Sequence, residues 1–189
     1  MWCERLQYTY KRKDCNRILK NHKGFTFIEL LIAIAVVAIT AAVAFPHIVG
    51  WMPNYRLKSA AKNLYSDMQK AKITALKHNS NVIIVFTTGS YAPAGRVGGY
   101  FIFIDNSPAN GSFDTGETIV SQVSMPANVS LYYSNFTSNT TGFNSRGLPW
   151  SNRWGNVRMQ NNNSRYYKIT LSSAGSFTMA MSTNGTTWF

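Results

Sequence analysis

Cysteine is scarce in this chain of 189 residues: there are only 2, and both lie close to the amino end. Both cysteines, Cys3 and Cys15, precede Gly24, where the character of the sequence changes. If the chain is cut at that glycine, the mature protein contains no cysteine. A redox site, a thiol nucleophile and a thiolate metal site would then all be excluded.

Acidic residues are also few, since 7 Asp and Glu stand against 19 Lys and Arg and give a net charge of +12. Such a surplus favours a negative partner, which leaves a membrane surface, a nucleic acid or an acidic protein open. The three histidines fall in no triad or metal-ligand spacing, and no glycine-rich phosphate loop follows a strand pattern. We therefore expect no catalytic residue and no cofactor, and we do not expect an enzyme.

One long apolar run stands near the amino end. Residues 1–24 carry a local charge of +5, whereas only Thr26, Glu29 and Thr40 are polar among the 21 residues from Phe25 to Phe45. At about 1.5 Å per helical residue this run crosses a hydrocarbon core of roughly 30 Å. Basic residues before it and none within it predict a cytoplasmic amino end.

Glu29 distinguishes this run from an ordinary anchor or signal peptide. A carboxylate inside an apolar helix costs about 2.5–3.5 kcal/mol on insertion scales, so it needs a partner. A secretory signal peptide would place its cleavage site after the apolar run, but here the Gly24 junction precedes it. A plain membrane anchor explains the hydropathy and leaves Glu29 without a role.

The stretch Lys23-Gly24-Phe25-Thr26-Phe27-Ile28-Glu29-Leu30-Leu31-Ile32-Ala33 resembles the prepilin signature of type IV pilins and type II secretion pseudopilins. The resemblance implies cleavage after Gly24 by a prepilin peptidase, methylation of the new Phe25 amine, and assembly with other pilins or pseudopilins. An α-amino group has a reference pKa of about 8, so Phe25 would supply the positive charge that Glu29 lacks. Between staggered neighbours the same pair could set the register of assembly.

Beyond the run we expect the helix to continue to about Lys77. Pro46 and Pro53 each remove a helical hydrogen bond and predict kinks, or else mark the end of the span. Further along, apolar residues at spacings of 4, 3, 4, 3 and 4 predict a stripe that packs on a sheet. The stripe consists of Leu57, Ala61, Leu64, Met68, Ala71 and Ala75. The basic residues off the stripe form either a solvated face or a surface for phosphates.

After Asn79 the pattern becomes that of β-strands separated by Gly, Pro, Asn and Ser clusters. Seven strands are predicted, at 82–88, 100–105, 118–123, 129–133, 156–160, 166–171 and 176–181. We therefore expect an α+β fold in which a long amino-terminal helix, hydrophobic and then amphipathic, packs on antiparallel β-sheets. The stretch from Gln160 to Ser164 is expected to be a polar hairpin tip.

Several downstream segments resemble the GspH/FimT group of minor pseudopilins and minor pilins. They are Arg56-Leu57, the helical stretch 65–71, Phe143-Asn144-Ser145-Arg146-Gly147-Leu148, and the stretch 169–175. The resemblance implies a pilin-like fold and a minor pilin or pseudopilin that assembles into, or primes the tip of, a type II secretion pseudopilus or a type IV pilus.

The expected organisation has three parts. Residues 1–24 form a basic leader that is cleaved, 25–53 a transmembrane and filament-core helix, and 54–189 a periplasmic α+β domain. The protein would then be a single-pass protein of the bacterial inner membrane, incorporated into a pilus or pseudopilus.

The alternative function is a DNA-binding minor pilin that contributes to DNA uptake in natural transformation. Relatives of FimT are associated with DNA uptake through a Gly-Arg-x-Arg stretch, but the matching place here reads Gly175-Ser176-Phe177-Thr178, without arginine. Other basic residues lie among aromatic ones in the β region, which leaves a weaker surface for phosphates and bases. The candidate nucleic-acid contacts are Arg153, Arg158, Arg165 and Lys168.

The acidic loop from Asp105 to Glu117 is a weak calcium candidate. Asp105, Asp114 and Glu117 could supply oxygen ligands, but Gly111 falls one place late for a calcium loop and Ala109 occupies a ligand position. A hairpin between two strands explains the same residues, and no other metal site is expected.

We predict cleavage between Gly24 and Phe25, because the basic leader cannot follow the apolar helix into a bilayer. Mass spectrometry of the mature protein should find an amino end at methylated Phe25. An intact leader in assembled material would refute this. The leader is long for such proteins, so the true start codon could lie downstream of Met1 without moving the cut.

Overall fold

The computed structural model describes residues 24–106 and 109–189, apart from the side chains of Pro46 and His47. The chain divides into two units, with the boundary after Phe45. The predicted leader lies outside the described residues, except for Gly24.

The first unit contains the beginning of helix α1 (Phe27–His78), whose 52 residues match the helix expected from Phe25 to about Lys77. Its stretch Phe27–Phe45 has a mean hydropathy of 2.6 and is long and apolar enough to cross a membrane. Every described side chain from Gly24 to Phe45 is exposed. The backbone is helical through Pro46 and Pro53, and the kinks expected at these residues stay predictions.

The second unit contains eight strands, all paired antiparallel. They are β1 (Asn81–Thr87), β2 (Gly99–Asp105), β3 (Thr118–Ser124), β4 (Val129–Ser134), β5 (Thr140–Phe143), β6 (Gly155–Asn161), β7 (Tyr166–Leu171) and β8 (Phe177–Ser182). Two short 3-10 turns, Thr137–Asn139 and Trp150–Asn152, flank β5. The strands form two four-stranded sheets, ordered β3-β2-β1-β5 and β4-β6-β7-β8.

Strand β5 is the one strand of this unit that the sequence analysis missed. Its four residues pair with β1, and all four are buried. Gly142 is needed there, because a Cβ at that position would clash with the carbonyl oxygen of Val82. The other seven strands agree with their predicted ranges to within a residue or two.

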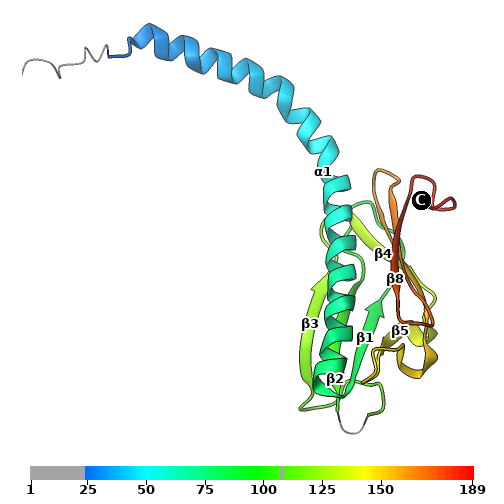
Figure 1. Cartoon of the computed structure of the whole chain (residues 1–189). Helices are drawn as coiled ribbons and strands as arrows, with labels where there is room; N and C mark the ends of the chain where they lie inside the picture. The colour runs from blue at the N-terminus through cyan, green and yellow to red at the C-terminus, as the bar shows by residue number, and fades with distance from the viewer. Residues whose placement is uncertain (1–23, 107–108) are drawn as a thin grey trace, which may run out of the picture. The chain divides into compact units, whose positions relative to one another are not determined.

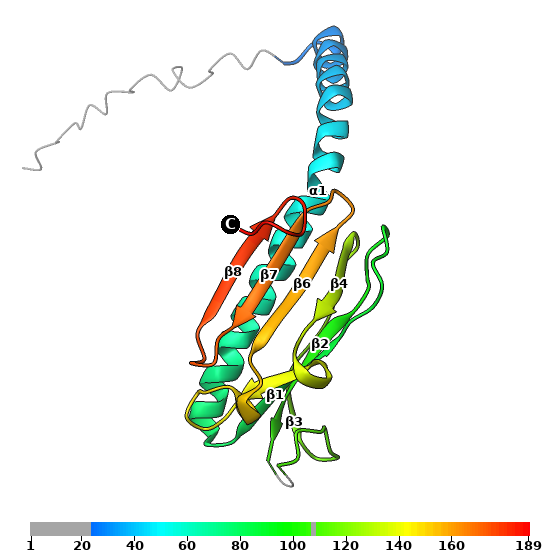
Figure 2. The ribbon, with the colours of Figure 1, turned by 90° about the vertical axis from the view of Figure 1, so that its right-hand side faces the viewer.

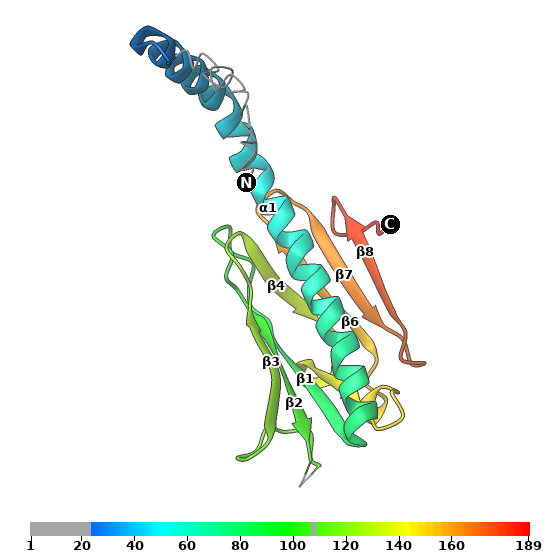
Figure 3. The same cartoon turned by 60° about the vertical axis from the view of Figure 1, so that its left-hand side comes forward.

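The second part of α1 covers one face of both sheets (Figures 1 and 3). All six residues of the predicted apolar stripe are fully buried. In the view turned by 90° from Figure 1, β8, β7, β6 and β4 lie in front of the helix (Figure 2). The main core is therefore a layer of side chains between one helix and two sheets, which confirms the expected α+β fold. Ile83 and Phe103 are also fully buried but lie outside this layer.

Leu64→Ala should lower the free energy of unfolding by about 2–5 kcal/mol, because the Leu64 side chain is 0% exposed and its loss leaves a cavity. Ile73→Ala is the matched control on the same helix. Ile73 is 63% exposed, so its truncation should change stability by no more than about 0.5 kcal/mol. Denaturant unfolding followed by circular dichroism measures both, and equal losses would contradict the assigned core face.

Candidate functional site

The predicted processing residues Gly24 and Phe25 lie just before α1, and Glu29 lies in its first turn. The Glu29 backbone N–H donates to the Thr26 hydroxyl at 3.2 Å, and the Leu30 N–H donates to the Thr26 carbonyl at 3.1 Å. Thr26 is therefore the N-cap of the helix, in a Thr-x-x-Glu arrangement typical of a capping box. Gly24, Phe25 and the Glu29 side chain are all exposed. Residues 24–29 thus leave both the cleavage site and the carboxylate accessible.

A cluster of cations and aromatic rings lies on the side of β6 and β7 that faces away from α1. The guanidinium of Arg158 lies 4.5 Å from the ring centre of Tyr133 and 5.5 Å from that of Trp188. The Lys168 amine lies 4.5 Å from the Trp188 ring centre. Arg158 and Lys168 are cross-strand neighbours. We call these four residues the outer cluster.

The two other candidate nucleic-acid contacts lie elsewhere. Arg153 packs on the Trp150 ring at 4.6 Å and donates to the Thr137 carbonyl at 3.4 Å. Arg165 precedes β7 and lines a groove beside α1 together with Tyr167. The fold thus brings Arg158 and Lys168 together and places Arg165 on the opposite side of their sheet.

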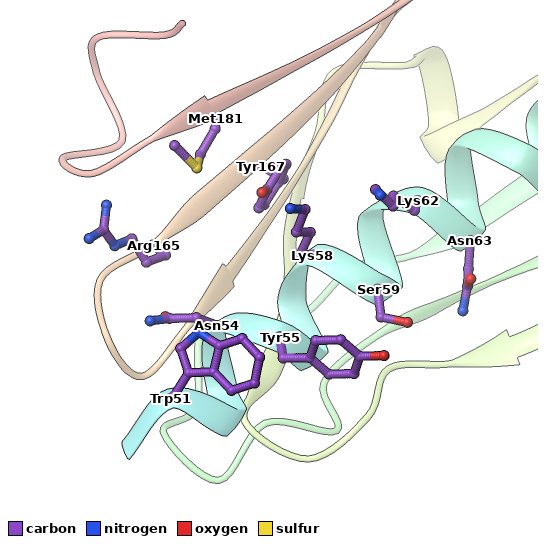
Figure 4. Close-up of a pocket in the computed structure, with 10 residues that line it drawn as sticks. All are labelled: Trp51, Asn54, Tyr55, Lys58, Ser59, Lys62, Asn63, Arg165, Tyr167 and Met181. Carbon is purple, nitrogen blue, oxygen red and sulfur yellow. The ribbon is translucent and has the colours of Figure 1, made fainter. Parts of the chain in front are cut away.

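The groove beside Arg165 has a volume of about 580 Å³ and lies between α1 and strands β7 and β8 (Figure 4). The helix wall carries aromatic and basic side chains, and the strands supply Tyr167 and Met181. Burial raises the pKa of the Tyr167 hydroxyl, and the positive charge of Arg165 offsets part of that rise. We call this the helix–hairpin groove; its lining includes Trp51, Tyr55, Lys58, Lys62 and Arg165.

The hairpin between β6 and β7 is tied to α1 at one end of this groove. The Asn161 side-chain amide donates to the Asn54 side-chain oxygen at 2.8 Å, and Asn163 donates to the Gly50 carbonyl at 3.0 Å. Asn161 also accepts from the Arg165 backbone N–H at 2.9 Å. These bonds hold Arg165 next to the helix, and they confirm the polar hairpin tip expected at 160–164.

The basic residues off the apolar stripe do not form one uniform solvated face. The Lys72 amine donates to the Gly175 carbonyl at 2.8 Å, and Arg56 donates to the Asn128 side chain at 2.7 Å. Gly147 and Gly175 both have φ of +74°, as their turns require. Gly147 and Gly175 belong to two segments that carry the GspH/FimT resemblance, and both lie next to Lys72. These contacts hold the two loops against α1.

The acidic loop between β2 and β3 uses its carboxylates on backbone amides. Asp105 accepts from the Gly111 N–H at 3.1 Å, and Glu117 accepts from the N–H groups of Asn106 and Asp114. Burial raises the pKa of the Asp105 carboxyl despite the Gly111 bond. Within residues 24–106 and 109–189 no three acidic, His or Cys side chains gather as metal ligands.

Two family models match the sequence. The model described as Type II transport protein GspH matches residues 60–175, and the prokaryotic N-terminal methylation motif matches residues 19–45. The first covers more than half of the chain, so the protein belongs to the GspH family of minor pilin-like proteins. These matches confirm the resemblance to the GspH/FimT group and the prepilin signature. The family comprises structural pilin-like proteins rather than enzymes.

Among solved structures the chain is similar to the type IV minor pilin FimU of Pseudomonas aeruginosa in two crystal forms. The first match has 17% identity and a TM-score of 0.48, and covers 67% of this chain and 89% of FimU. The second has 16% identity and a TM-score of 0.47, and covers 65% and 91%. A comparison with curated protein sequences gave no match.

The sequence analysis missed the helix side of the groove and the ring at the centre of the outer cluster. Trp51, Tyr55, Lys58 and Lys62 are spaced 4, 3 and 4 residues apart, which places them on one helix face. That spacing could have been read from the sequence. Trp188 could not, because nothing in the sequence brings the carboxyl end to β6.

We predict that Ca²⁺ does not stabilise the protein through the acidic loop. A site with a Kd of about 1 mM would raise the free energy of unfolding by about 1.4 kcal/mol at about 10 mM Ca²⁺. We expect no such increase, because Asp105 and Glu117 already accept backbone hydrogen bonds. Thermal unfolding with Ca²⁺ and with equal Mg²⁺ measures this, and stabilisation by Ca²⁺ alone would contradict it.

Proposed function

We propose that this chain is a minor pilin or pseudopilin that is cut after Gly24, methylated at Phe25, and assembled into the tip of a pilus or secretion pseudopilus. Before assembly its apolar helix anchors it once in the bacterial inner membrane, with the β-rich domain in the periplasm. Residues 1–24 are then the leader, 25–53 the membrane and filament-core helix, and 54–189 the periplasmic domain. Prepilin peptidase and other pilins or pseudopilins are its partners.

Glu29 is the observation that carries this proposal. It is the one carboxylate in the stretch Phe27–Phe45, and neither a simple anchor nor a signal sequence uses it. Cleavage creates a cationic amine at Phe25, four residues earlier. In an assembly the Glu29 of one subunit can pair with the Phe25 amine of a neighbour, which offsets the cost of burying both charges.

The capping geometry gives Glu29 a second, local role that must be separated from assembly. Its backbone N–H donates to the Thr26 hydroxyl, a bond that does not involve the Glu29 side chain. A carboxylate near the helix amino terminus also interacts favourably with the helix dipole, by about 0.3–1 kcal/mol. This contribution is smaller than the roughly 3–5 kcal/mol lost when one member of a buried ion pair is removed.

DNA binding is the second candidate function, and the outer cluster favours it because two cations and two rings share one accessible face. The geometry also limits the cluster. Arg158 and Lys168 already lie over the rings, which occupies ring faces on which bases would stack. The matching Gly-Arg-x-Arg arginines are absent, and Thr178 takes one of their places. We therefore rank DNA binding below assembly.

Glu29→Ala and Glu29→Gln should both insert normally and lower incorporation into filaments by more than about tenfold, because both remove the charge that pairs with Phe25. Membrane fractionation together with immunoblotting of sheared filaments separates insertion from incorporation. Thr40→Ala is the control, since Thr40 is the other polar side chain in the stretch Phe27–Phe45. Normal incorporation of Glu29→Gln would contradict the ion-pair role.

A soluble fragment that begins at Asn54 should bind duplex DNA no tighter than about 10 micromolar at physiological salt. If the outer cluster neutralises two phosphates, the logarithm of the affinity should fall with a slope of about −1.8 against the logarithm of salt concentration. Fluorescence anisotropy at several salt concentrations measures both values.

Matched variants show whether that binding is specific. Arg158→Ala with Lys168→Ala should reduce the magnitude of the salt slope by about 1.8. Lys70→Ala with Lys77→Ala removes the same charge from exposed helix positions and should leave the slope of the outer cluster unchanged. Submicromolar binding that is lost only in the first pair would make DNA capture the leading function.

A further inference from the structure

The helix–hairpin groove lies where the exposed apolar surface of α1 ends. Beyond Phe45, within the second unit, Ile48, Val49 and Trp51 are 53%, 53% and 63% exposed. When α1 is inserted as proposed, these side chains lie next to the hydrocarbon core. The rings of Trp51 and Tyr55 lie 5.8 Å apart and are both exposed. Such aromatic pairs are typical of the boundary between hydrocarbon and headgroups.

The groove carries positive charge at this boundary. Lys58 follows Tyr55 by less than one turn, and its amine lies between α1 and Tyr167 (Figure 4). Arg165 lines the strand side, and the bond from Asn163 to the Gly50 carbonyl holds its hairpin at the level of the last exposed apolar residues. No acidic side chain is among the described residues that line the groove.

We propose that the helix–hairpin groove binds the headgroup of an anionic phospholipid while the protein is in the membrane. Lys58 and Arg165 bind the phosphate from opposite sides of the groove, and Trp51 and Tyr55 contact the glycerol and upper acyl region. Asn54 and Ser59 offer neutral hydrogen-bond partners on the helix wall. The inference rests on the proposed membrane anchoring, because it needs α1 to be inserted.

The groove suits a headgroup better than a nucleic acid. Its cations stand on two walls of one concave site of about 580 Å³, rather than along an extended surface that could follow a phosphate backbone. Bases of a nucleic acid would need free aromatic faces on which to stack, whereas a lipid headgroup does not. The outer cluster, on the other side of the sheet, would be unaffected by an occupant of the groove.

Native mass spectrometry of the full chain in an uncharged detergent tests the proposal with phosphatidylglycerol and phosphatidylcholine of equal acyl chains. We expect phosphatidylglycerol to be retained preferentially. Lys58→Gln with Arg165→Gln should weaken its binding by about tenfold or more. Lys70→Gln with Arg146→Gln removes the same charge from exposed sites outside the groove and should change binding by no more than about twofold.

Four outcomes overturn the assignment. Equal weakening in both variant pairs would show a net-charge effect, and equal retention of the two lipids would show no headgroup site. Competition by inorganic phosphate as strong as by the lipid would indicate a site for free phosphate. Displacement of phosphatidylglycerol by duplex DNA would indicate a nucleic-acid site.

Carbonate extraction of membranes separates this inference from the proposed function. If the chain resists extraction and still shows no preference for phosphatidylglycerol, only the groove assignment fails. If the chain is extracted, the membrane anchoring fails, and both proposals fall with it.

Discussion

The contact between the apolar stripe of α1 and the two sheets supports everything else in the second unit. Each sheet has four strands and turns an apolar face toward α1, and neither sheet could hide that face from water alone. Small residues at Ala61, Ala71 and Ala75 let the helix backbone approach the strands, while Leu57, Leu64 and Met68 fill the space between them. The turns, the hairpin tip and the groove all depend on a helix held in this register.

Much of this fold was predictable because its determinants are periodic. The stripe repeats every three to four residues over about five turns, so each of its residues indicates a helix with the same buried face. The alternation of residue types likewise predicts β6, in which buried and partly exposed residues alternate along the whole strand. β5 was missed because Thr140-Thr141-Gly142-Phe143 is short and buried at every position, which leaves no alternation to detect. Gly142 also reads as a turn signal, although here it allows the close approach of β1.

The candidate surfaces were less predictable, because they depend on pairings between distant strands. Arg158 and Lys168 meet only because β6 and β7 pair in one register. Composition alone groups Arg165 with them, but Arg165 is three residues from Lys168, and a residue at odd spacing lies toward the opposite side of the sheet. The ties of Lys72 to Gly175 and of Asn161 to Asn54 join residues more than 100 positions apart. No local pattern encodes such contacts.

The hairpin bonds to Gly50 and Asn54 have a mechanical consequence. Strands β6 and β7 run alongside α1, so a force applied along the helix axis loads the helix–sheet contact in shear rather than peeling it apart (Figure 2). In shear, the buried stripe and the hairpin's hydrogen bonds bear the load together, and the first slip must break contacts along the whole interface. A force that pulls a subunit by its helix would therefore be transmitted to the β-domain without separating the two. A sideways force at the hairpin tip would instead act first on the hydrogen bonds of Asn161 and Asn163 to α1.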